Sequence, residues 1–135
     1  MTTLSSLYAM AERQGLDVYY FPMRQNAAVS TPDGCIGIDV DRLEDSAAEK
    51  ACLAHEMGHC LTGSFYRLDT PLALRSRAEE RADRWAIRQL VPLRELRRAL
   101  RAGLGRPDEL AEHFGVPEDI IGKAIFYYRD ARNEL

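Results

Sequence analysis

Residues 46–63, SAAEKACLAHEMGHCLTG, decide the fold of this chain. Ser46 followed three residues later by Glu49 is a capping-box pattern, and Gly63 suits the end of a helix. The stretch therefore predicts a helix from Ser46 to about Leu61. Its many alanine, cysteine and leucine residues are typical of a helix buried among neighbours, not of one surrounded by water.

The motif HEMGH, residues 55–59, lies within this helix. Residues four apart on a helix point within about 40° of each other, so His55 and His59 share one face and can bind one metal ion. Glu56 lies about 100° round the axis, close enough to reach a metal-bound water as a general base. The alternative is a pair of core histidines with ordinary hydrogen bonds. Unpaired buried polar groups are costly, and a metal would satisfy all three side chains.

A catalytic zinc site normally has three protein ligands, so a third is expected from elsewhere in the chain. The segment AEERADRWA, residues 78–86, carries two candidate carboxylates on the next predicted helix. Glu79 shares a face with Ala82, Ala86 and Leu90, which should pack inward, whereas Glu80 shares a face with arginines. The sequence therefore predicts His55, His59 and Glu79 as the metal ligands.

Four other residues keep two interpretations each. Cys52, three residues before His55, is either a third ligand or a small core residue. Asp83 either supports a ligand histidine from behind or pairs with a surface arginine. His113, the remaining histidine, is either a third ligand or an exposed or locally hydrogen-bonded side chain, and we expect the second. Tyr66, which follows the motif, is either an oxyanion donor or a packed loop aromatic.

Working outward, the remaining chain predicts an α+β domain in which a small antiparallel sheet lies beside a helical bundle. Proline and glycine residues punctuate the elements. We expect a helix over 4–14, a strand over 17–23, a hairpin over 27–39, a helix over 76–90 and a fourth helix between Pro92 and Gly103. A helix-turn-helix is expected over 109–128. We divide the chain into a core over 1–92 and a helical C-terminal segment over 93–135 that packs on the core.

The charged residues of the chain indicate which kinds of partner it can bind. The 135 residues carry a formal net charge of −3, which argues weakly against a nucleic-acid partner. The second helix of the helix-turn-helix also begins with Glu118 and Asp119, which would repel phosphate, so we expect no direct DNA binding. Arginines crowd residues 67–106, either as solvated helix faces or as a docking surface for an acidic partner.

The cysteines, the start of the chain and its apolar stretches predict where in the cell the protein is found. The three cysteines match no disulfide framework, which indicates reduced thiols. No secretory signal opens the chain, and no apolar stretch is long enough to span a bilayer. We therefore expect a cytoplasmic protein with no membrane association.

At HEMGH, at EERADRWAIRQLVP (79–92) and at ELAEHFGVPEDIIGKAI (109–125), the sequence resembles the ImmA/IrrE family of metallo-endopeptidases. Trp85 stands where the family usually has phenylalanine, and Val91 where methionine is common. The resemblance implies a zincin-like fold, a zinc ion on His55, His59 and Glu79, and Glu56 as the catalytic base. It also implies a substrate class, the helix-turn-helix repressors of mobile elements or stress responses.

Two functions are consistent with these motifs. The first is a zinc-dependent endopeptidase that cleaves such a repressor. The alternative is a non-catalytic, zinc-containing interaction or regulatory protein. Glu56 favours the enzyme, because a purely structural zinc site has no use for a base beside the metal.

Overall fold

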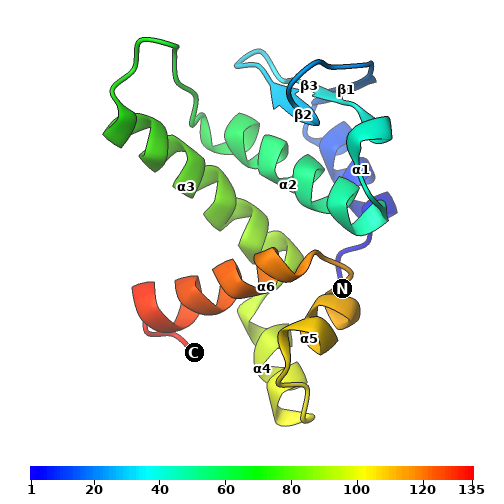
Figure 1. Ribbon diagram of the computed structural model, residues 1–135, viewed down its shortest axis with the longest axis vertical. Helices are drawn as coiled ribbons and strands as arrows, with labels where there is room; N and C mark the ends of the chain where they lie inside the picture. The colour runs from blue at the N-terminus through cyan, green and yellow to red at the C-terminus, as the bar shows by residue number, and fades with distance from the viewer.

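The computed structural model describes all 135 residues and places α2, Ser46–Thr62, at the centre of the molecule (Figure 1). Asp45 caps the helix, and its side chain accepts a hydrogen bond of 2.8 Å from the backbone N–H of Ala48. The predicted cap at Ser46 is therefore wrong by one residue. The predicted end is confirmed, because Gly63 adopts the left-handed conformation that glycine favours after a helix.

A three-stranded sheet and α1, Leu4–Arg13, lie on one side of α2 (Figure 1). The strands are β1, Asp17–Tyr20, β2, Ala28–Ser30, and β3, Cys35–Ile38, in the order β1-β3-β2. The expected hairpin is present, since β2 and β3 pair antiparallel, with Val29 opposite Gly37. Strand β2 forms the edge of the sheet and packs against α2.

The α+β class is confirmed, but the sheet is mixed, not antiparallel throughout. Strand β1 pairs parallel with β3, and Val18 lies opposite Ile36. The connection over residues 21–27 reverses the chain and carries it across β3, so that β2 pairs on the far side. Asp39 anchors this connection by accepting a hydrogen bond of 2.8 Å from the backbone N–H of Met23. Such long-range anchors leave no pattern in the sequence.

Helix α3, Leu72–Leu90, packs on the opposite side of α2 from the sheet (Figure 1). It begins four residues earlier than expected, directly after Pro71, whose carbonyl accepts hydrogen bonds from the backbone N–H groups of Leu74 and Arg75. The two helix backbones are in close contact at Gly58. A Cβ atom there would lie 2.6 Å from the backbone oxygen of Ala82, so only glycine fits. This contact places the HEMGH face of α2 against α3.

Gly58→Ala should destabilise the protein by roughly 1–3 kcal/mol, because the added methyl group forces two packed helix backbones apart. The matched control is Gly122→Ala in α6, where a Cβ would meet nothing within 4 Å. That control should be neutral or stabilising by up to about 1 kcal/mol, because alanine favours helix. Urea denaturation of both variants provides the measurement. Equal stability of the two variants would contradict the close approach at Gly58.

Four elements complete the chain, and Pro92 and Gly103 flank the first of them as expected. They are α4, Leu93–Arg101, α5, Pro107–Phe114, α6, Glu118–Ile125, and a π-helical turn, η2, Phe126–Ala131, that continues α6. A short 3-10 turn, η1, Val40–Arg42, follows β3. Pro107, which was expected in a linker, instead forms the first turn of α5.

One hydrophobic cluster of 20 buried residues runs from Leu7 in α1 to Tyr128 in the π-helical turn. The C-terminal helices are also tied to α2 by Lys50, whose buried ammonium group donates 2.7 Å to the carbonyl of Phe114 and 3.0 Å to that of Thr2. Burial lowers the pKa of Lys50. None of the helices combines the length and apolar character that a membrane crossing requires.

Candidate metal centre

The two histidines of the motif point at one place beside α2. Their rings meet edge to face with centroids 4.8 Å apart, and the Nε2 atoms of His55 and His59 lie 3.2 Å from each other. His59 is almost fully buried, while His55 keeps a quarter of its side-chain surface exposed. The expected shared helical face is therefore present.

Glu79 reaches the same place from α3. Its Oε2 lies 2.8 Å from Nε2 of His55, and its Oε1 lies 3.3 Å from Nε2 of His59. Glu80 points to solvent, on the face that carries Arg84, and the two side chains form no ion pair. Arg84 instead donates 3.3 Å to the backbone carbonyl of Glu80. The rotation expected for this helix is confirmed by the burial of Ala82, Ala86 and Leu90.

The three side chains fit a zinc ion. One ligand atom from each of His55, His59 and Glu79 lies within 4.8 Å of the others. Two ligands of a tetrahedral zinc, each 2.0–2.1 Å from the ion, lie about 3.3 Å apart. The separations of 3.2 Å between the two imidazole nitrogens and 3.3 Å between His59 and Glu79 match that spacing, and the separation of 2.8 Å between His55 and Glu79 is shorter. Two imidazole nitrogens and a carboxylate oxygen are also a ligand set that zinc accepts.

Asp83, one helical turn after Glu79, contacts the back of His55. Its Oδ1 lies 2.8 Å from Nδ1 of His55, and its Oδ2 lies 3.5 Å from Nζ of Lys123 in α6. Burial lowers the pKa of His55, but the hydrogen bond and negative charge of Asp83 outweigh burial and raise it overall. For Asp83 the directions are reversed: burial raises its pKa, but the contacts with His55 and Lys123 outweigh burial and lower it overall. Of the two interpretations of Asp83, the contact with the histidine is present, and its basic partner is Lys123, not an arginine.

The loop after α2 supplies further contacts. Nδ1 of His59 is hydrogen-bonded to the backbone carbonyl of Ser64, and the Phe65 ring lies 5.7 Å from the His59 ring. The hydroxyl of Tyr66 donates 2.8 Å to Oε1 of Glu79. Burial raises the pKa of Glu79, but the Tyr66 hydrogen bond and the two histidines lower it overall. The hydrogen bond to Glu79 raises the pKa of Tyr66.

Glu56 lies on the wall of the same cleft and is held by a residue that sequence reasoning missed. The hydroxyl of Ser30, in the edge strand β2, donates 2.6 Å to Oε1 of Glu56. A single serine in a three-residue strand carries no motif, so the contact appears only when β2 packs on α2. Ser30 therefore restricts the orientation of the Glu56 carboxylate.

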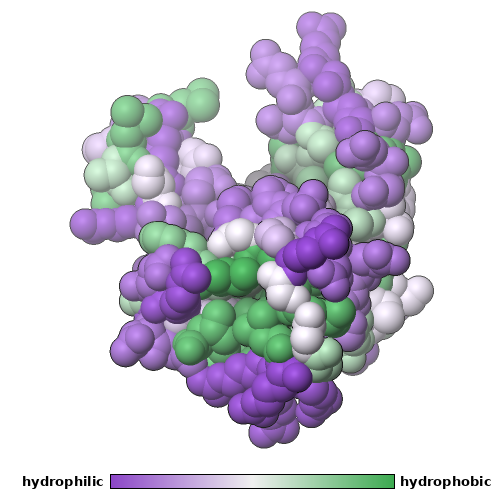
Figure 2. Space-filling view, turned by 60° about the horizontal axis from the view of Figure 1, so that its bottom comes forward, coloured by the Kyte–Doolittle hydropathy of each residue, from purple (hydrophilic) through white to green (hydrophobic).

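These side chains line one open cleft between the sheet and the loop that joins α2 to α3. Figure 2 shows it as a notch between two lobes, the loop with the start of α3 on one side and the sheet on the other. The cleft is lined by Asn26, Ala28, Val29, Ser30, His55, Glu56, His59, Phe65, Tyr66 and Glu79. The candidate base and the three candidate ligands thus face the same space.

Two alternative ligands lie outside the cluster. His113 is exposed on α5, where its ring packs edge to face on Phe114. Cys52 is half-buried on α2, and burial raises the pKa of its thiol. Neither belongs to the group of potential ligand atoms. All three cysteines are free thiols, as expected.

Comparison with known proteins agrees with this geometry. The family described as the IrrE N-terminal-like domain, peptidase family M78, matches residues 11–126. No curated protein and no solved structure matches the chain. The family match spans both the motif helix α2 and the Glu79 helix α3, and therefore the whole cluster of candidate ligands. The chain accordingly belongs to the IrrE N-terminal-like family of metallopeptidases.

Proposed function

We propose that this protein is a zinc-dependent endopeptidase in which His55, His59 and Glu79 hold the metal and Glu56 is the general base. The observation that carries the proposal is the convergence of the three ligand atoms, within 4.8 Å of one another, on a cleft whose wall contains Glu56. A structural zinc site would need a fourth protein ligand, whereas His55, His59 and Glu79 line an open cleft.

Each side chain then has a defined part in peptide hydrolysis. When bound, zinc supplies Lewis-acid activation of the scissile carbonyl and of the attacking water. Glu56 takes a proton from that water and returns it to the leaving amine. Ser30 holds Oε1 of Glu56, which leaves the other carboxylate oxygen available to accept the proton. Asp83 keeps the Nε2 atom of His55 directed at the cleft by binding its Nδ1 atom.

The proposed substrate is a helix-turn-helix repressor of a mobile element or stress response. The resemblance to the ImmA/IrrE family supports this class, and the open cleft can admit a segment of another protein. DNA-binding repressors and free thiols are both typical of the cytoplasm, where we place the reaction. The non-catalytic alternative does not account for a glutamate held beside the cluster by its own serine.

The purified protein should contain about one zinc per chain, and His55→Ala and His59→Ala should each lose it. Elemental analysis gives the zinc content, with His113→Ala as the matched control because His113 lies outside the cluster. Full zinc content in both motif variants would remove the metal assignment.

Co-expression with a candidate helix-turn-helix repressor, chosen from the genes that flank its own where one is encoded there, tests the reaction. Cleavage of the repressor is expected in the presence of the wild-type protein and not in the presence of His59→Ala. Zinc-loaded wild-type protein that leaves such repressors intact would favour the non-catalytic alternative.

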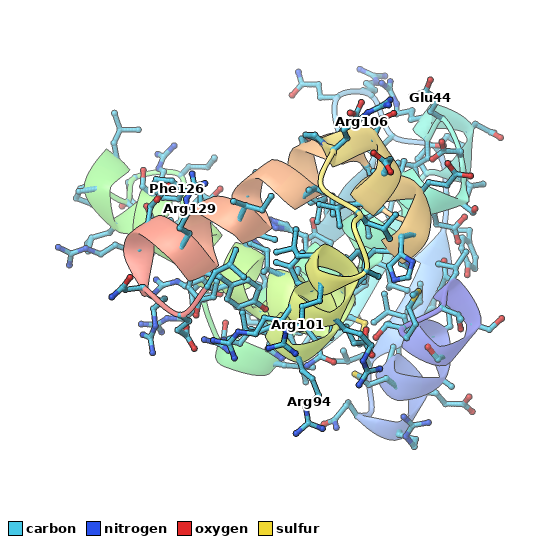
Figure 3. The ribbon with its side chains drawn as sticks, turned by 90° about the horizontal axis from the view of Figure 1, so that it is seen from below. Glu44, Arg94, Arg101, Arg106, Phe126 and Arg129 are labelled. Carbon is cyan, nitrogen blue, oxygen red and sulfur yellow. The ribbon has the colours of Figure 1, made fainter.

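We further propose that the protein does not bind DNA directly. Arg94 and Arg101 project from α4 into solvent (Figure 3), so this helix presents basic side chains at the surface. By contrast, α6 is the second helix of the predicted helix-turn-helix. Its first turn carries Glu118 and Asp119, whose negative charges would repel the phosphates of DNA. A gel-shift assay of the full chain with duplex DNA should show no salt-sensitive complex, and such a complex would contradict the proposal.

A further inference from the structure

Each candidate ligand has one partner that holds it from outside the cluster. Asp83 of α3 binds His55, the Ser64 carbonyl binds His59, and the Tyr66 hydroxyl binds Glu79. Two of these three partners therefore come from residues 64–66, the start of the loop between α2 and α3. Neither HEMGH nor the motif over residues 79–92 includes residues 64–66, so these contacts are a property of the tertiary structure.

Glu79 depends more than the histidines on its partner. Its side chain is 40% exposed, compared with 25% for His55 and 7% for His59. An exposed glutamate has several rotatable bonds, and ordering it costs conformational entropy that packing does not offset here. Apart from the two imidazoles of the cluster, the side chain that restricts its carboxylate is Tyr66, through the hydrogen bond of 2.8 Å.

Tyr66 is itself fixed within the loop. The guanidinium of Arg75 lies over its ring, 5.8 Å from the centroid. Arg75 also donates 2.8 Å to the backbone carbonyl of Thr70, which ties the loop to the first turn of α3. The Tyr66 hydroxyl thus reaches Glu79 from a supported ring.

We propose that Tyr66 is a positioning residue that holds Glu79 in its metal-binding orientation, so that the loop after α2 sets the affinity of the metal site. The inference rests on the proposed function, because it takes Glu79 as a ligand. A carboxylate has lone pairs enough to bind a metal and still accept a hydrogen bond, so the Tyr66 contact is compatible with a loaded site. Partners of this kind typically contribute a factor of about 10–100 to metal affinity.

The test is the zinc dissociation constant of Tyr66→Phe, measured by competition with a chromophoric chelator. Phenylalanine keeps the ring and removes only the hydroxyl, so we expect affinity to fall by about 10–100-fold with the circular dichroism spectrum unchanged. Tyr19→Phe is the matched control, because Tyr19 is similarly exposed, in β1, and makes no side-chain hydrogen bond. That control should bind zinc as tightly as the wild type.

A second measurement separates positioning of Glu79 from a general effect on the loop. Tyr66→Phe should cause no further loss of zinc affinity in a Glu79→Gln background, because the group that it positions is gone. The visible absorption spectrum of the cobalt-substituted protein should also differ between the wild type and Tyr66→Phe, because a loosened Glu79 changes the coordination.

Three results would overturn the inference, and they can be told apart. Wild-type zinc affinity in Tyr66→Phe would overturn it while leaving the proposed function intact. Unchanged zinc affinity together with lost cleavage would assign the hydroxyl to the substrate oxyanion instead. Absence of zinc binding by the wild type would overturn the proposed function and this inference together.

Discussion

Glu56→Gln is expected to lower repressor cleavage by at least about 100-fold while zinc content and thermal stability stay at wild-type levels. The amide has nearly the same shape as the carboxylate but cannot accept a proton from water. It can still accept the hydrogen bond that the Ser30 hydroxyl donates to Oε1, so the fold near the cleft should be preserved. Cleavage is measured by following the repressor on a gel over time, and zinc by elemental analysis.

The matched control is Glu44→Gln. Glu44 is exposed and does not line the cleft. The control should cleave at the wild-type rate, which shows that the loss of one negative charge has no general effect. Undiminished cleavage by Glu56→Gln would exclude Glu56 as the base and leave the metal assignment standing.

Glu79→Gln should weaken zinc binding by two orders of magnitude or more, whereas Glu80→Gln should leave it unchanged. The reason is geometric, since the Glu79 carboxylate lies 2.8 Å and 3.3 Å from the two imidazole nitrogens while Glu80 faces solvent. Removing one of three protein ligands also removes the negative charge that offsets the cation. Competition with a chelator measures both affinities in the same buffer.

Glu80→Gln is a matched control for Glu79→Gln, because both substitutions change the net charge by one and lie on the same helix. A large loss in Glu80→Gln and none in Glu79→Gln would mean that α3 is rotated by about 100° from the orientation described. Asp83 lies on the same stripe of α3 as Glu79, so such a rotation would also move Asp83 away from His55.

Most of the candidate site can be predicted from the sequence because it obeys helical periodicity. Spacing within HEMGH places His55 and His59 together, and the alternation of alanines and arginines in α3 separates Glu79 from Glu80. Both inferences concern which face of a helix a residue occupies, and both agree with the burial of the neighbouring alanines. Periodicity also located α1, while proline and glycine residues located α4 and the two short helices around Gly115.

The direction of β1 and the start of α3 could not be obtained in this way. A short apolar strand has the same pattern whether its neighbour runs parallel or antiparallel, and the pairing depends on where the connection over residues 21–27 crosses β3. The residue after Pro71 was expected in a loop, because a proline is compatible with either a loop or the first turn of a helix.

The sequence by itself determined which residues can form the metal centre, because the face that each side chain occupies on its own helix is a local property. Only the tertiary structure decided what surrounds them. Ser30 meets Glu56 because β2 packs on α2, Tyr66 meets Glu79 because the loop folds back over α3, and α3 lies this close to α2 because Gly58 has no side chain. These contacts join residues from 13 to 26 positions apart, where chain connectivity imposes no fixed geometry and packing alone sets the distance.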